Sequence, residues 1–363
     1  MLKVHFLNVG KGTIQFLIII LSVIINSFAI ANELSITSVP PTQAETKVLG
    51  RTAWTMYIDG EFDKNSPEKV KQELQKLSKV GVSVYLNSPG GNLLAGVEIG
   101  RLIRKMAIDT NIGKMPSKNN HAQPGECYSA CALAFLGGPY RYINKGSVYG
   151  VHRASRSTGS ESMDLEVGQI LSADIASYIR EMGANPGLFD LMVKAGSNEI
   201  YLLSEHEAKD LYVVNNGRMS PEWSIEATPQ GTYLKGVQDT VYGEGKLMFT
   251  CHKDTIIIFS FYQAGDRAKL IANSGWVHSL MIDEDVISLP TPSMITNKGD
   301  FIESLFLLKN SQFPFSQVVL AKSIGHAMQP TRKAPTYVGY NVDIDSKSEQ
   351  RVRNYIGNCS QIK

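Results

Sequence analysis

The sequence carries almost no excess charge and few cysteines, and these two shortages exclude several classes of protein. Its 36 Lys and Arg nearly balance its 34 Asp and Glu, and no run of five basic residues occurs. A nucleic-acid-binding protein needs a basic surface that neutralises phosphates, so we expect no nucleic-acid partner. The four cysteines include no C-x-x-C pair and no histidines cluster beside them, so we expect no metal site. No motif predicts a cofactor, and the histidines other than His152 stand singly, as structural or surface residues do.

Long apolar runs are also scarce, because the chain has one such run, from Ile14 to Ala31. Basic residues precede it, no acidic residue accompanies it, and it ends in the small-x-small sequence Ala-Ile-Ala. These features are typical of a cleaved signal peptide, so we expect residues 1–31 to be removed and the protein to be exported to the periplasm. The alternative is an uncleaved N-terminal membrane anchor, because a run of about 18 residues can just span a bilayer.

Export bears on the cysteines, because disulfides form in an oxidising compartment. Cys127 and Cys131 stand four residues apart. A bond across one turn of a regular helix is strained, but a cysteine that precedes the helix can reach its partner more easily, so we favour this pairing. The alternative is a pair of small buried apolar side chains. Elimination then pairs Cys251 with Cys359.

Residues 53–215 alternate between apolar strands and amphipathic helices, which predicts an α/β domain. Strands are expected at Trp54–Ile58, Val82–Leu86 and Ile108–Ile112, with a helix after each of the first two. This alternation predicts crossover units on a mostly parallel sheet. The polar stretch 32–52 before it is expected to be a linker.

The character of the sequence changes in its second half. Residues 216–236 lose the periodicity and are expected to be a second linker, and residues 237–363 predict a smaller β-rich accessory domain with a C-terminal helix. We find no catalytic motif in that domain. Its expected strands are Lys246–Cys251, Thr255–Tyr262, Phe301–Leu308, Gln317–Ala321 and Pro335–Asp343.

Three features in the first domain could carry chemistry, although each also has an ordinary structural interpretation. The sequence N-S-P-G-G at residues 87–91 follows a strand and precedes a helix, where glycines can expose backbone N–H groups, but most such turns are simple connections. Ser129 stands where a polar loop meets an apolar helix, a place where a serine is usually an N-cap. His152 ends a strand and could act as a base if a hydroxyl group lay within hydrogen-bond reach.

Taken together, the order and spacing of these features resemble the Clp protease proteolytic subunit and its Clp/crotonase superfamily. In that family an N-S-P-G-G turn, a serine at a helix start and a strand-borne histidine follow one another, and here Ser129 and His152 are 23 residues apart. The C-x-S-A-C-A sequence around Ser129 is most similar to exported Clp-like proteins. The resemblance covers roughly residues 53–215 and implies a ββα-superhelix fold there.

The resemblance implies a serine peptidase that hydrolyses peptides or polypeptides. Ser129 would be the nucleophile and His152 the general base and acid. The backbone N–H groups of Gly91 and Ala130 would form the oxyanion hole. Family members commonly assemble into oligomers, so self-association is expected. No ATPase partner is expected, because the periplasm lacks ATP.

One position departs from the family pattern. The family places an aspartate about eight residues before the serine that starts its last helix; counting back from Ser204, that position is Gly196. Asn198 or Glu199 could orient His152 instead, or a dyad could act without a third member. The departure therefore keeps a second hypothesis open, in which the domain is an inactive binding or scaffolding module. A third hypothesis, a crotonase-type acyl-CoA enzyme, is disfavoured because its substrates are cytosolic.

Overall fold

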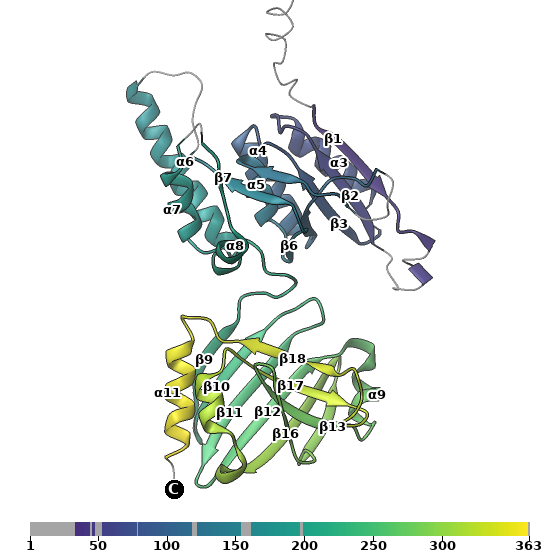
Figure 1. Cartoon of the computed structure of the whole chain (residues 1–363), viewed down its shortest axis with the longest axis vertical. Helices are drawn as coiled ribbons and strands as arrows, with labels where there is room; N and C mark the ends of the chain where they lie inside the picture. Colours follow the sequence, from purple (N-terminus) through teal and green to yellow (C-terminus); the bar gives the residue numbers. More distant parts are fainter. Residues whose placement is uncertain are drawn as a thin grey trace, which may run out of the picture.

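The computed structural model of the chain contains two hydrophobic cores (Figure 1). One core is built from residues 34–214 and the other from residues 223–356. The expected signal peptide at residues 1–31 lies outside the residues that the structure describes, within which no helix is long and apolar enough to cross a membrane. The described residues are 33–43, 46–47, 53–77, 79–117, 122–153, 161–196 and 199–361, without the side chains of 161–166.

The first core surrounds a five-stranded sheet with the strand order β1-β2-β3-β4-β6. Strands β2, β3, β4 and β6 run parallel, as the sequence pattern predicts, whereas β1 pairs antiparallel with β2. Because β1 lies within residues 32–52 and its Ile36 packs against the core, the expectation that this whole stretch is a linker is wrong. The strands are β1 (Ser35–Val39), β2 (Trp54–Asp59), β3 (Val82–Asn87), β4 (Asp109–Ile112) and β6 (Arg141–Ile143).

A smaller three-stranded sheet, β5-β7-β8, completes this mixed α/β part of the chain. Strand β7 (Val148–Val151) is parallel to β5 (Glu126–Tyr128) and antiparallel to β8 (Tyr201–Leu202). An isolated bridge between Ser88 and Cys127 links the end of β3 to this sheet. The helices are α3 (Ser66–Lys76), α4 (Leu93–Lys105), α5 (Ala130–Leu136), α6 (Glu161–Glu181), α7 (Gly187–Lys194) and α8 (Glu205–Asp210).

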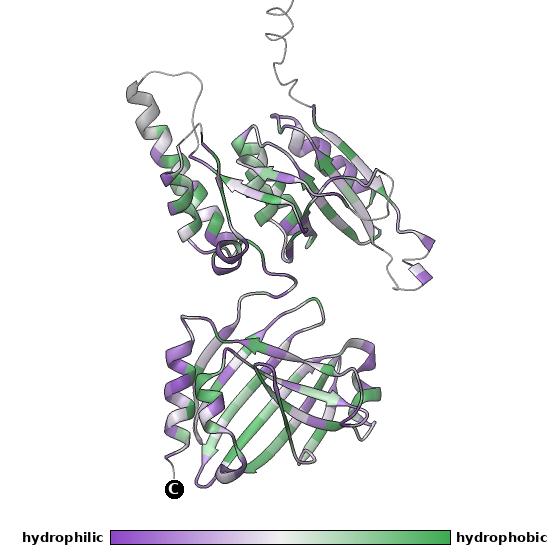
Figure 2. Ribbon diagram, in the orientation of Figure 1, coloured by the Kyte–Doolittle hydropathy of each residue, from purple (hydrophilic) through white to green (hydrophobic). Residues whose placement is uncertain are grey.

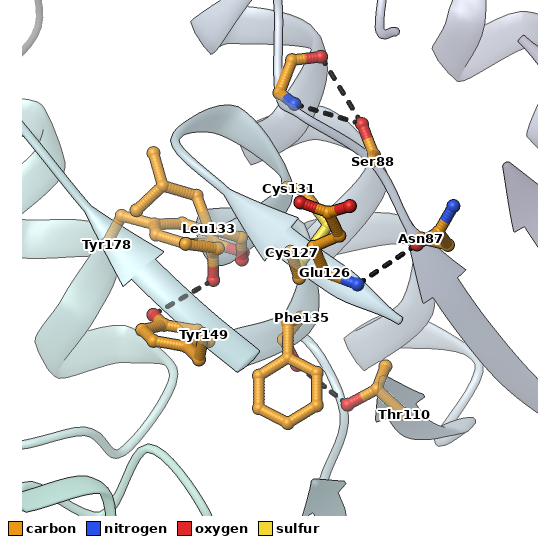
Figure 3. Close-up of a disulfide and its surroundings, with 12 residues drawn as sticks. Asn87, Ser88, Thr110, Glu126, Cys127, Cys131, Leu133, Phe135, Tyr149 and Tyr178 are labelled. Carbon is orange, nitrogen blue, oxygen red and sulfur yellow. Dashed lines mark hydrogen bonds between the residues drawn. A yellow bond between two sulfur atoms is a disulfide. The ribbon is translucent and has the colours of Figure 1, made fainter. Parts of the chain in front are cut away.

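Every residue of the short helix α5 is buried, so its terminal carbonyl groups need partners inside the protein. The Tyr178 hydroxyl donates to the carbonyl of Leu133, and the Thr110 hydroxyl donates to that of Phe135, each at 2.7 Å (Figure 3). These side chains come from α6 and from β4. The hydrogen bonds that α5 requires therefore join it to a helix and a strand distant in sequence.

Two arginines serve the carboxyl-terminal end of α5. Arg141 is 2% exposed and donates to five backbone carbonyls, and Arg104 donates to four. Both reach the carbonyls of Leu136, at the end of α5, and of Met182, just after α6. A positive charge is favourable at the carboxyl end of a helix. Burial lowers the pKa of Arg141 to about 10, which still leaves its guanidinium charged at neutral pH.

Helix α4 comes very close to α5 because two glycines on one of its faces carry no side chain. A Cβ atom added to Gly96 would lie 2.2 Å from the carbonyl oxygen of Ala130. One added to Gly100 would lie 1.8 Å from the Tyr178 hydroxyl. Residues four apart share a helix face, so these glycines form one continuous smooth strip. The strip leaves room for the buried helix and for the tyrosine that satisfies it.

The second core lies between two antiparallel sheets. One has six strands in the order β15-β16-β12-β11-β10-β9, and the other has four in the order β14-β13-β17-β18. The buried residues of the core come from both sheets. Buried residues alternate with less buried ones along β12 and β16, as expected when one face of each strand faces the core, and Figure 2 shows hydrophobic residues along these strands.

The bounds of these strands correct two expectations. Residues 222–238 form β9 and β10 of the large sheet, so the expected linker at 216–236 is mostly folded. The segment Gln317–Ala321, expected as a strand, lies mainly in helix α10 (Phe315–Leu320). The strands are β9 (Glu222–Thr228), β10 (Gly231–Gln238), β11 (Gly245–His252), β12 (Thr255–Gln263), β13 (Val277–Ile282), β14 (Asp285–Ser288), β15 (Met294–Lys298), β16 (Phe301–Lys309), β17 (Ser323–Gln329) and β18 (Val338–Asp343).

The C-terminal helix α11 (Glu349–Cys359) packs on this part of the chain, as expected from the sequence. Its buried residues Val352 and Ile356 belong to the second core. A disulfide joins Cys359 to Cys251 on β11, across 108 residues of sequence. This bond ties the last helix to the large sheet. The remaining short helix, α9 (Ala268–Ala272), follows β12.

The second core also holds a buried polar chain that the sequence analysis did not foresee. Ser260 Oγ lies 2.7 Å from His326 Nδ1 and 2.9 Å from the Tyr340 hydroxyl. The other ring nitrogen of His326 lies 2.9 Å from His278 Nδ1, and the two imidazole rings are stacked. Both histidines are at least 95% buried, at 1% and 5% exposure. The expectation that these histidines stand singly is therefore wrong for this pair.

The buried histidine pair predicts a loss of stability in mild acid. Burial lowers the pKa of His278 to about 4 and that of His326 to about 3. In the unfolded chain both titrate near the ordinary value of about 6.5. Between these values the unfolded state binds more protons, so stability falls as the pH falls from about 6.5 towards 4, by up to about 1.4 kcal/mol per pH unit for each histidine.

Urea unfolding between pH 7.5 and 4.5 measures this loss. In a Trp54→Phe variant, the remaining tryptophans, Trp223 and Trp276, both lie in the second part of the chain and report its unfolding. The exposed His252 provides the control, because His252→Ala should leave the acid dependence unchanged. An unfolding free energy that stays constant from pH 7 to pH 5 would contradict the prediction.

Candidate active site

Ser129 stands between β5 and α5 with a backbone conformation that non-glycine residues rarely adopt. Its φ is 57° and its ψ is −120°. Such a conformation costs on the order of 1–3 kcal/mol and persists where the surroundings impose it, most often at functional sites. The Ser129 side chain makes no hydrogen bond to the helix, so it is not the N-cap of the ordinary interpretation. A strained strand-to-helix turn that carries a serine whose hydroxyl makes no capping bond is the geometry of a nucleophile elbow.

Three connections hold the elbow in this conformation. The Ser129 N–H donates to the carbonyl of Gly150 on β7 at 3.1 Å, and the Tyr128 N–H donates to the carbonyl of Ser88 at 3.1 Å. The third is the disulfide between Cys127 and Cys131, which brackets the serine by two residues on each side (Figure 3). Its Cα atoms are 5.1 Å apart, and both residues are completely buried. The four cysteines are thus joined in the pairing that the sequence analysis favours.

The glycine turn at residues 87–91 lies directly against the elbow. A Cβ atom added to Gly90 would stand 2.7 Å from the Cβ of Ser129 and 3.1 Å from the nitrogen of Ala130. Both Gly90 and Gly91 have positive φ angles, of 106° and 114°. The structure therefore brings Gly90, Ser129 and the Ala130 N–H together, whereas the nearest atoms to a Cβ added to Gly91 belong to Phe62 and Glu61.

The backbone hydrogen bonds of this turn leave the Gly91 N–H out. The Gly90 carbonyl accepts from the Phe62 N–H, and the Phe62 carbonyl accepts from the Asn92 N–H, both at 2.7 Å. The Gly90 N–H donates to the hydroxyl of Ser88 at 3.1 Å. Ser88 is completely buried and so helps to shape the turn, a role that the sequence analysis missed although the residue lies inside the motif.

His152 follows directly after β7 and is half-buried. Because Tyr128 and Gly150 are paired on parallel neighbouring strands, Ser129 and His152 leave the sheet at the same edge. The His152 Nδ1 atom lies 3.0 Å from the carbonyl oxygen of Arg153. Within the described chain, no hydrogen bond joins His152 to the Ser129 hydroxyl, so the two side chains share an edge without the direct contact of a formed dyad.

The position that would hold a third catalytic member lies close to His152. The Arg153 N–H donates to the carbonyl of Ala195 at 3.3 Å, so the segment before Gly196 runs beside the strand end. Asn198 lies outside the described residues, and Glu199 is exposed, with its N–H bonded to Gly196 at 3.2 Å. Among the described side chains, none with a carboxylate bonds to His152. The expected capping box, Ser204 with Glu207, is present at the start of α8.

The two residues that flank the serine, Tyr128 and Ala130, are uncharged. Burial raises the pKa of the Tyr128 hydroxyl, and the carboxylate of Glu126 raises it further, so Tyr128 is neutral at physiological pH. Ala130 and the residues after it in α5 are apolar and buried. No group of three metal-binding side chains occurs in the described part of the chain. The arrangement therefore offers a hydroxyl, an imidazole and backbone N–H groups as its reactive and polar elements.

Comparisons with known proteins give structural matches alone. No family model matches the sequence, and no curated protein matches it. The chain is similar to ClpP1 from Listeria monocytogenes, with 21% identity and a TM-score of 0.35 over 44% of this chain and 88% of that chain. It is also similar to a serine-to-alanine mutant of the 1510-N membrane-bound stomatin-specific protease, with 17% identity and a TM-score of 0.34 over 45% and 76%.

The close contact between the glycine turn and the elbow predicts that Gly90→Ala destabilises the first part of the chain. The new methyl group would collide with Ser129 and with the carbonyl of Tyr128, at 2.7 Å from each, and φ of 106° is unfavourable for alanine. We expect a loss of about 2 kcal/mol or more, measured by calorimetry. The matched control is Gly357→Ala on α11, where nothing lies within 4 Å of the new Cβ and stability should not fall. Equal unfolding temperatures of the two variants would contradict the prediction.

Proposed function

We propose that the first part of the chain is a serine peptidase that hydrolyses peptides or polypeptides. Ser129 is the nucleophile, His152 the general base and acid, and the N–H groups of Gly91 and Ala130 form the oxyanion hole. One observation carries this proposal: Ser129 has a positive φ, at the start of a buried helix, and its hydroxyl makes no capping bond. A protein gains nothing for its stability from such a conformation, whereas a nucleophile needs it.

The tautomer of His152 suits the role of base. A carbonyl oxygen can only accept, so the contact with Arg153 requires the proton on Nδ1. The Nε2 atom then carries the lone pair that can take the proton of Ser129. The binding of substrate has to close the remaining gap, as is common for catalytic hydrogen bonds in unliganded enzymes.

The reaction then follows the usual course of acyl transfer. Ser129 Oγ attacks the scissile carbonyl carbon while His152 Nε2 accepts the hydroxyl proton, and the Gly91 and Ala130 N–H groups stabilise the negative oxygen. His152 gives the proton to the departing amine, which leaves an acyl-enzyme ester on Ser129. Water attacks this ester with His152 again as base, and the serine is restored.

The orienting group in this scheme is a backbone carbonyl in place of a carboxylate. The Arg153 carbonyl holds Nδ1–H but has no full negative charge, so it stabilises the imidazolium less than an aspartate would. Loss of the orienting carboxylate can cost about 10⁴-fold in turnover in a triad enzyme. We therefore expect slow turnover, with acylation still detectable by a reactive probe.

A second candidate function is a binding or scaffolding module without activity. The missing Ser129–His152 hydrogen bond and the absence of a bonded carboxylate among the described side chains favour it. Labelling with a serine-reactive probe separates the two functions, because an inactive module has no activated serine.

We further propose that the protein is exported, with residues 1–31 removed as a signal peptide, and that it self-associates.

Labelling with a fluorophosphonate probe tests the peptidase. We expect the wild type with both disulfides formed to be labelled at Ser129. Both Ser129→Ala and His152→Ala should lose at least about 90% of the label, because the proposed reaction depends on one nucleophile and one base. The matched controls are Ser360→Ala and His206→Ala, which change an exposed serine and an exposed histidine outside the elbow and should label like wild type.

Two results would refute the peptidase. One is equal labelling of wild type and Ser129→Ala. The other is no labelling of a folded wild type whose two disulfides are intact by mass spectrometry. Either result leaves the binding module as the function that the site supports.

A further inference from the structure

A cavity of about 420 Å³ opens at one end of the second core, away from the peptidase site. It lies beside the start of β13, the segment that follows β14, and the loop after β17. Its walls are mainly apolar, with one imidazole and one guanidinium among them. Its lining includes Trp276, His278, Leu289, Pro290, Pro292 and Arg332.

The buried polar chain determines which proton each of its members carries. The Tyr340 hydroxyl donates its single proton to the backbone carbonyl of Lys246, which can only accept. The Ser260 hydroxyl must therefore donate to Tyr340. With its own proton used, Ser260 Oγ has to accept the proton on Nδ1 of His326.

The chain of proton donors continues from His326 to His278 at the cavity. Burial lowers the pKa of both histidines far below neutrality, so each ring carries one proton at physiological pH. His326 has its proton on Nδ1, so its Nε2 accepts the Nδ1 proton of His278. The Nε2 atom of His278 is then left without a proton, as a pure hydrogen-bond acceptor. The tautomer of His278 is thus set by a carbonyl three hydrogen-bonded side chains away.

This acceptor has no partner among the described residues. His278 is 5% exposed and lines the cavity, and no hydrogen bond of its Nε2 occurs within the described chain. The atom is also not among the polar atoms sealed from solvent without a partner. A buried chain that ends in an unpaired lone pair at a cavity wall indicates a site built for a ligand that donates a hydrogen bond.

The remaining groups of the cavity add two requirements. Arg332 is exposed and has no ion pair with any described residue, so its charge is available to an anion. Trp276, Leu289, Pro290 and Pro292 offer an apolar surface. A fitting ligand therefore combines an N–H or O–H donor, a negative charge and an apolar body. No group of three metal-binding side chains lies in the described chain, so a lone histidine here does not define a metal site.

We propose that this cavity binds an N-acylated apolar amino acid with a free carboxylate, which is the chemistry of the C-terminal residue of a polypeptide. The amide N–H donates to His278 Nε2, the carboxylate pairs with Arg332, and the side chain packs against Trp276 and the prolines. One residue of this kind supplies all three groups within a short span. Simple carboxylates lack the hydrogen-bond donor, and amines lack the negative charge.

Calorimetric titration of the Ser129→Ala protein with acetyl-Ala-Ala-Phe tests the site without interference from cleavage. The peptide with a free carboxylate should bind at least about tenfold more tightly than its C-terminal amide, because the amide loses the charged pair. Arg332→Gln should remove this difference. The matched control is Lys333→Gln, which deletes the neighbouring exposed charge that does not line the cavity and should leave both affinities unchanged.

A second comparison tests the acceptor. The analogue whose last amide N–H is replaced by an ester oxygen should bind more weakly, by about fivefold or more, because Nε2 then faces another acceptor. His278→Phe should bind both compounds alike. If that variant does not fold, the affinities of the peptide and of its ester analogue for the cavity with His278 in place still test the acceptor.

The same titration, repeated with acetyl-phenylalanine, distinguishes two sources of the ligand. Equal affinity for acetyl-phenylalanine and for the tripeptide supports a small acyl amino acid, whereas much tighter tripeptide binding supports polypeptide ends. Equal binding of acid and amide, unchanged binding by Arg332→Gln, or no binding of any of these compounds at about 1 mM would overturn the proposal. None of these results depends on activity at Ser129, so this site and the peptidase can fail separately.

Discussion

The complete burial of helix α5 is the constraint on which the first part of the structure depends. A helix inside a protein cannot leave its terminal carbonyls to water, so Tyr178, Thr110, Arg104 and Arg141 must reach them. These side chains come from α6, β4, α4 and β6 and therefore fix the helix relative to both neighbouring helices and the sheet. The other end of the same helix carries the serine. Because α5 cannot shift, the strain at Ser129 has no way to relax.

Close packing and strain serve the same end on the other side of the elbow. Gly96 lets α4 touch the first turn of α5, and Gly90 lets the preceding turn touch Ser129 itself. Side chains at these positions would force the backbone apart and remove the N–H groups from the serine. The disulfide of Cys127 with Cys131 adds a covalent limit at the same point. The elbow is thus enclosed by steric, hydrogen-bonding and covalent restraints, which is what a preorganised site requires.

The second part of the chain uses burial in a different way. Its core contains a line of hydrogen bonds from Tyr340 to His278 in place of hydrophobic contacts alone. Such a network is costly if any member is unsatisfied, yet its last atom, His278 Nε2, has no hydrogen-bond partner among the described residues and His278 lines a cavity. The apolar neighbours, including Phe306 against both rings, hold the imidazoles in place and keep them neutral. The burial that keeps both imidazoles neutral also lowers the stability of this part of the chain in acid.

Local patterns in the sequence determined the alternation of strands and helices, the helix start at Ser204 and the glycine-serine-histidine set, because each depends on neighbours within a few residues. Residues 317–321 were misassigned since a short apolar run fits a strand and a helix equally. Tertiary structure alone decided the φ of Ser129, which distant hydrogen bonds impose. It also decided the pairing of His278 with His326, which are 48 residues apart. The sequence could not predict this pair, because contacts between strands of one sheet leave no periodic trace in the sequence.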